Sequence, residues 1–176
     1  MRRLPSDWES LSADHRNALE QFAATVRQLP PGSWNNPLAP GKWTPAEISS
    51  HLIASYRIMR TELAGGAGMA LRLKPFQRWV LRRTVFPRIL RGGPFPAGAR
   101  APRETRPVEV IQDLPESLGV LTTEAKALVE ELTARASAGR VRLTHAYFGG
   151  MSPRQSLQLL AVHTRHHARQ VAGLHR

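Results

Sequence analysis

Two helix-start signals of the same kind constrain the fold of this chain more than any other feature of its sequence. Thr44-Pro45-Ala46-Glu47 and Ser152-Pro153-Arg154-Gln155 each begin with a hydroxyl residue and a proline and end with Glu or Gln. This is the pattern of a capping box with proline at the first helical position, where a missing N–H costs nothing. The sequence therefore predicts that one helix begins at Pro45 and another at Pro153.

Apolar residues recur at steps of three or four over long stretches of the chain, as is typical of amphipathic helices. Four segments have this spacing: residues 8 to about 29, 45 to about 65, about 108 to 136, and about 153 to 173. Pro115 could divide the third segment into a short and a long piece, and no segment has a convincing strand pattern. We predict an all-α fold, a four-helix bundle, in a single domain over residues 1–176.

Residues 66–107, between the second and third predicted helices, differ from the rest of the chain. The stretch 72–106 holds ten Arg or Lys residues against one acid, so it carries a net charge of +9 out of +12 for the whole chain. Apolar residues from Leu73 to Ile89 alternate with arginines and predict a basic amphipathic helix that Pro87 limits or kinks. Residues 92–107 are rich in Pro and Gly and predict an irregular loop. We therefore predict a basic helical and loop insertion.

The composition excludes several classes of chemistry. The chain has no cysteine, which rules out disulfides and thiolate ligands, so any metal would be held by His, Asp, Glu or water. No segment is apolar for long enough to span a membrane, and the N-terminus lacks the apolar run of a signal peptide. We therefore expect a cytoplasmic protein.

Three of the seven histidines fall within the stretch HTRHH, residues 163–167. His163 and His167 are four residues apart, so on a helix they lie on one face and both rings could reach a single ion. That face is otherwise apolar and is expected to point inward, whereas His166 lies about 100° away and is expected at the rim or surface. The alternatives are a hydrogen-bonded histidine pair in the core, or a helix turned so that all three histidines face water.

His51 lies on the apolar face of the second predicted helix. If that helix runs antiparallel to the last one or crosses it obliquely, His51 meets the pair, and three imidazoles with an open position are typical of catalytic zinc. Taken alone, His51 would be read as a hydrogen-bonded core histidine. Gln170, about one turn beyond His167, is a candidate to orient a ligand, with a solvated side chain as the alternative. No carboxylate pair or Ser-His-Asp arrangement identifies a catalytic residue.

Two stretches resemble the motifs of the DinB-like superfamily, which includes bacillithiol-transferase-like and mycothiol-dependent enzymes. They are KWTPAEISSHL, residues 42–52, and HAYFGGMSPRQSLQLLAVHTRHHARQ, residues 145–170. The resemblance covers nearly the whole chain. It implies a four-helix bundle that pairs as a homodimer and holds a divalent metal, zinc or nickel, on His51, His163 and His167. His145-Ala146 departs from the His-Pro often found there, and we expect His145 to have a turn or packing role.

The resemblance also implies an activity on a small-molecule substrate. The positive charge of the insertion suggests that this substrate is anionic. A metal-dependent enzyme of this kind would perform thiol-dependent group transfer or hydrolysis, with a low-molecular-weight thiol as a candidate cofactor. The insertion, residues 66–107, could cover the end of the bundle where substrate enters, so the substrates of better-known members do not carry over.

The main rival is a non-catalytic binding protein. Its basic amphipathic segment, residues 72–106, would contact an anionic partner, either a membrane surface or nucleic acid. Two plainer readings of the same segment remain open: arginines that are solvated while the apolar face packs on the bundle, or arginines that recognise an anionic substrate.

Overall fold

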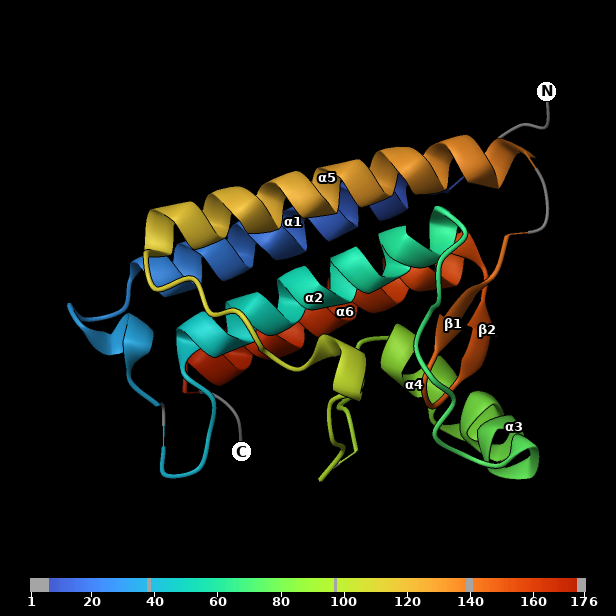
Figure 1. Cartoon of the computed structure of the whole chain (residues 1–176), viewed down its shortest axis with the longest axis horizontal. Helices are drawn as coiled ribbons and strands as arrows, with labels where there is room; N and C mark the ends of the chain where they lie inside the picture. Colours follow the sequence, from blue (N-terminus) through green and yellow to red (C-terminus); the bar gives the residue numbers. More distant parts are fainter. Residues whose placement is uncertain (1–6, 38, 97, 139–140, 174–176) are drawn as a thin grey trace.

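Four long helices lie side by side in the computed structural model, which describes residues 7–37, 39–96, 98–138 and 141–173 (Figure 1). They are α1 (Trp8–Arg27), α2 (Pro45–Leu63), α5 (Leu114–Ala138) and α6 (Pro153–Val171). Helix α1 packs mainly on α6, and α2 mainly on α5. In Figure 1, α2 and α5 run in one direction and α1 and α6 in the other. The predicted all-α bundle is confirmed.

Both predicted helix starts are present. The Thr44 hydroxyl accepts a hydrogen bond from the Glu47 N–H at 3.0 Å, and the Glu47 carboxylate accepts one from the Thr44 N–H at 2.7 Å. Ser152 and Gln155 make the same reciprocal pair, at 3.2 and 3.1 Å. Each box satisfies two N–H groups that a helix start leaves without a partner. The N-terminal ends of α2 and α6 are thereby anchored.

Helix α5 begins six residues later than predicted, at Leu114 instead of residue 108. Asp113 precedes it and accepts a hydrogen bond from the Glu116 N–H at 2.8 Å. Pro115 lies in the first turn, where proline is tolerated, so it opens the helix and does not divide it.

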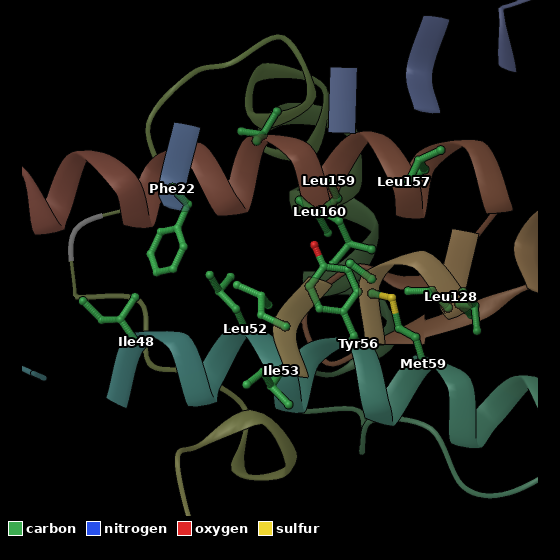
Figure 2. Packing of buried hydrophobic residues seen from close by; sticks show 14 of the residues in the cluster. Phe22, Ile48, Leu52, Ile53, Tyr56, Met59, Leu128, Leu157, Leu159 and Leu160 are labelled. Atoms are coloured by element: carbon green, nitrogen blue, oxygen red, sulfur yellow. The ribbon is translucent and has the colours of Figure 1, made fainter. Parts of the chain in front are cut away.

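The core lies between the four helices and contains large apolar side chains from each (Figure 2). Phe22, Leu52, Leu128 and Leu160 are fully buried and come from α1, α2, α5 and α6 in turn. Tyr56 is buried with them, and Figure 2 shows its hydroxyl pointing from α2 towards α6. Among the described helices, none is both long and apolar enough to cross a bilayer.

The insertion predicted at residues 66–107 lies against the α2 and α6 side of the bundle. It contains α3 (Pro75–Thr84), α4 (Phe86–Leu90) and a short 3-10 helix, η2 (Arg103–Thr105). The basic helix predicted from Leu73 to Ile89 is interrupted near Pro87, as expected: α3 ends at Thr84, and Pro87 lies in the first turn of α4. Helix α4 contacts α6, and η2 contacts α2.

Arg82, one of the ten basic residues at positions 72–106, anchors α3 to the rest of the protein. Arg82 donates hydrogen bonds to the carbonyl oxygens of Phe148 and Gly150, at 3.1 and 2.7 Å, and to Oε1 of Gln155 at 3.3 Å. These contacts join α3 to the segment that leads into α6. Replacing Arg82 would therefore disturb the fold and would not report on the exposed surface alone.

The prediction that the chain has no strand is wrong. β1 (Leu143–His145) and β2 (Gly149–Met151) form an antiparallel hairpin just before α6. Each strand has three residues, which is too short for an alternating pattern to emerge from the sequence. The carboxylate of Glu62, at the end of α2, accepts hydrogen bonds from the N–H and hydroxyl of Thr144 at 2.8 and 2.6 Å. A partner distant in sequence thus holds the hairpin.

Candidate metal centre

The three histidines singled out in the sequence meet between α2 and α6. These helices run antiparallel in Figure 1, which brings His51 on α2 opposite His163 and His167 on α6. Nε2 of His163 lies 3.1 Å from Nε2 of His51 and 3.0 Å from Nε2 of His167. The candidate ligand atoms all lie within 4.8 Å of one another. Ligands at 90–110° around an ion with bonds of 2.0–2.1 Å are about 2.9–3.4 Å apart, which agrees with the two contacts made by Nε2 of His163.

Hydrogen bonds fix the tautomers of two of the rings. Nδ1 of His51 lies 2.6 Å from the carbonyl oxygen of Thr105, and Nδ1 of His167 lies 2.6 Å from Oε1 of Gln170. Carbonyl oxygens only accept, so both Nδ1 atoms carry the proton and both neutral rings present a lone pair at Nε2.

Both of these lone pairs face Nε2 of His163. The question is whether a hydrogen bond or a metal ion satisfies this arrangement. A neutral His163 can donate at most one hydrogen bond from Nε2, so it cannot satisfy both neighbours at once. A cation among the three Nε2 atoms satisfies all of them. The donor set therefore fits a divalent cation better than it fits a hydrogen-bonded histidine cluster.

The surroundings keep the cluster in the neutral form that binds metals. His51 and His167 are buried, and His163 is half-buried. Loss of hydration lowers the pKa of His51 from 6.5 to about 4. Burial, followed by the neighbouring His167 and His51, lowers the pKa of His163 well below 6.5. Fewer protons therefore compete with a cation for these nitrogens at neutral pH.

The insertion contributes residues that contact this histidine cluster. The Thr105 carbonyl of η2 holds His51, and the ring of Phe95 lies 5.7 Å from the His163 ring and 4.9 Å from that of His166. The ring of Trp43 lies 5.1 Å from the His51 ring. Neither Thr105 nor Phe95 was predicted, because a backbone carbonyl carries no side-chain signal and an aromatic residue in a Pro/Gly-rich loop has no periodicity to place it.

Two other histidines near the centre lie outside the three-residue cluster. His166 is half-buried beneath Phe95, which agrees with the predicted rim position. Nδ1 of His145 accepts a hydrogen bond from the Tyr147 N–H at 3.2 Å, and its ring stacks on Phe148 with centroids 4.7 Å apart. His145 therefore has the turn and packing role expected for it.

Replacing Gln170 should weaken metal binding without unfolding the protein. Gln170→Ala removes the acceptor that orients His167, and losing such an outer partner typically costs about 10- to 100-fold in metal affinity. Gln170→Glu keeps an acceptor at the same place and is expected to bind metal as the wild type does. Competition titration of zinc against a chromogenic chelator measures both. The exposed neighbour Arg169→Gln serves as the matched control, and an equal loss in that variant would contradict a specific role for Gln170.

Comparison with known protein families supports this description. The family model of the DinB superfamily matches residues 14–171, which include both capping boxes and all three clustered histidines. No curated protein matches the chain, and no solved structure does. The match extends over most of the sequence and agrees with the helical architecture and the histidine cluster, so the chain belongs to the DinB superfamily.

Proposed function

We propose that this protein is a metal-dependent enzyme whose reactive centre is a divalent cation on His51, His163 and His167. The observation that supports it most is the convergence of three Nε2 atoms, two of which have their lone pairs fixed by hydrogen bonds at Nδ1. Imidazole nitrogens suit zinc and nickel. A cation bound there would supply Lewis acidity and lower the pKa of a water or thiol at its open position.

We further propose that the reaction is thiol-dependent group transfer or hydrolysis on a small molecule. The carbonyl of Thr105 and the amide of Gln170 would hold the ligating rings in one orientation during the reaction. Phe95 and Trp43 flank the histidines and would limit the access of water to a bound substrate. The positive charge of the insertion, part of which lies beside the histidines, favours a substrate with negative charge.

Two titratable residues on α2, Glu47 and Tyr56, are poor candidates for proton transfer. The Glu47 carboxylate is occupied in the helix cap. The Tyr56 hydroxyl lies 2.7 Å from Nε2 of His15 in the core, and burial raises the pKa of Tyr56 above its usual value. Both residues therefore support the fold, and the proposed chemistry rests on the histidine cluster.

The test combines elemental analysis with an activity panel on the purified full chain. We expect about one zinc or nickel ion per chain, as in other three-histidine sites with an open position. We also expect turnover with a low-molecular-weight thiol and an electrophile, or with an ester or amide, that chelation abolishes and added metal restores. Failure to bind either metal after reconstitution would overturn the proposed centre. Metal binding without turnover across the panel would overturn the reaction class. The expected homodimer and cytoplasmic location stay predictions.

A further inference from the structure

Helix α3 presents aromatic side chains to solvent. All ten of its residues are described, and none of them is buried. Phe76 is 72% exposed and Trp79 is 55% exposed, whereas most large apolar side chains in the described chain lie in the core. Phe76, Trp79 and Arg83 share one face because they are spaced three and four residues apart. The helix packs on the protein through Leu81 on its opposite face and through the anchoring residue Arg82 at its flank. The outward face is therefore held rigidly and left uncovered.

Positive charge surrounds this aromatic face, which consists of Phe76, Trp79 and Arg83. The Phe76 ring stacks on that of Trp79 with centroids 6.1 Å apart, and the Arg83 guanidinium lies 5.7 Å from the centre of the Trp79 ring. Lys74 and Arg88, just before and after α3, are also exposed. Glu104, the single acid of residues 72–106, lies 3.9 Å from Arg72 and outside the aromatic face.

We propose that the aromatic face of α3 docks on the surface of an anionic lipid bilayer. A tryptophan and a phenylalanine at the headgroup level bury apolar surface, while arginines and lysine beside them contact lipid phosphates. Both parts are present on one short, solvent-facing helix that stands apart from the four long helices in Figure 1. The proposal concerns where the protein resides and does not depend on the metal centre.

Charge and ring geometry favour lipid over the other occupants of such a face. A second copy of the chain would bring an equally basic face against the first, and like charges in contact are unfavourable. Single-stranded nucleic acid would stack bases on free aromatic faces. Trp79 is instead flanked along the helix by Phe76 one turn before it and by Arg83 one turn after it. An exposed helix whose aromatic rings are already paired fits the headgroup region of a bilayer better than a stack of nucleic-acid bases.

Co-sedimentation of the full chain with large unilamellar vesicles tests the proposal. We expect binding to vesicles of phosphatidylcholine with about 30% phosphatidylglycerol, no binding to phosphatidylcholine alone, and release in about 0.5 M NaCl because salt screens the attraction. Phe76→Ala/Trp79→Ala and, separately, Arg83→Gln/Arg88→Gln should each weaken binding by at least about tenfold. Arg82 is left intact because it anchors the helix.

A matched control separates a specific face from diffuse positive charge. Arg16→Gln/Arg27→Gln removes the same charge from exposed positions of α1 and should bind vesicles as the wild type does. Circular dichroism and thermal unfolding check that each variant is folded. The proposal is overturned if the wild type does not bind anionic vesicles at low salt, or if the α1 variant loses as much binding as the α3 variants. It is also overturned if oligonucleotides, and not vesicles, bind in a way that depends on Phe76 and Trp79.

Discussion

His163→Ala is expected to lower the affinity of the protein for zinc or nickel on the order of 1,000-fold, beyond the roughly 10- to 100-fold loss typical of removing an outer hydrogen-bond partner. Nε2 of His163 lies within 3.1 Å of both other candidate ligand atoms. Removing this ring leaves only two nitrogens to hold the ion. Chelator competition measures the affinity, and elemental analysis measures the ion retained after purification. Any metal-dependent turnover should disappear with the ion.

His166→Ala is the matched control for this experiment. His166 lies on the same turn of α6 and is half-buried against Phe95, yet it is not one of the three clustered histidines. It should therefore keep the affinity of the wild type. Equal losses in the two variants would show that metal binding depends on the local packing of α6 and not on the three-histidine set. Thermal unfolding of both metal-free proteins checks that His163→Ala still folds.

Acidification from pH 6.5 to 4 is expected to cost the folded state on the order of 3 kcal/mol through His15 alone. Burial lowers the pKa of His15 from 6.5 to about 4, while Asp14 raises it and Arg165 lowers it to lesser extents. Between these pH values the unfolded chain binds a proton that the folded chain does not, so stability rises with pH across this window. The contribution of His15 is therefore complete above pH 6.5 and is lost as the pH falls towards 4.

Urea unfolding of the metal-free wild type and of His15→Gln, measured from pH 7 to pH 4.5, isolates this contribution. The variant should be less stable at pH 7, because His15 and Tyr56 form a buried hydrogen-bonded pair with 2.7 Å between Nε2 and the hydroxyl oxygen. The difference in unfolding free energy between the two proteins should shrink as the pH falls. His145, whose pKa burial also lowers to about 4, is present in both proteins and cancels. A difference that does not change with pH would contradict the assignment to His15.

The sequence was informative where a local pattern determines the structure. The capping boxes at Thr44 and Ser152 fixed the starts of α2 and α6, because their hydrogen bonds join residues three apart. Helical phase then separated His163 and His167 from His166, and the same spacing pointed to Gln170, which bonds His167 within a single turn. The family resemblance supplied the pairing of α2 with α6 that the spacing left open.

Features set by contacts distant in sequence could not be predicted in this way. The hairpin at residues 143–151 is held by Glu62 from α2, and nothing near Thr144 indicates that partner. His51 takes its tautomer from the carbonyl of Thr105, more than fifty positions away. The start of α5 at Leu114 depends on the Asp113 cap, which lacks the proline-containing signature of the other two starts.

The parallel course of α2 and α5 has a consequence for how this architecture can change. Helix α2 has 19 residues, or about 28 Å, so roughly nine extended residues would return the chain to the start of α5. The protein uses residues 64–113 for that return, a span of 50 residues. The additional residues form α3, which faces outward, and η2 with its neighbouring loop beside the histidines, while the three candidate ligands lie on α2 and α6. Because η2 holds His51 through the backbone carbonyl of Thr105, the side chains of this segment can change without releasing the His51 ring. The long helices that carry the histidines and the segment that lies beside them can therefore change independently of each other within one chain.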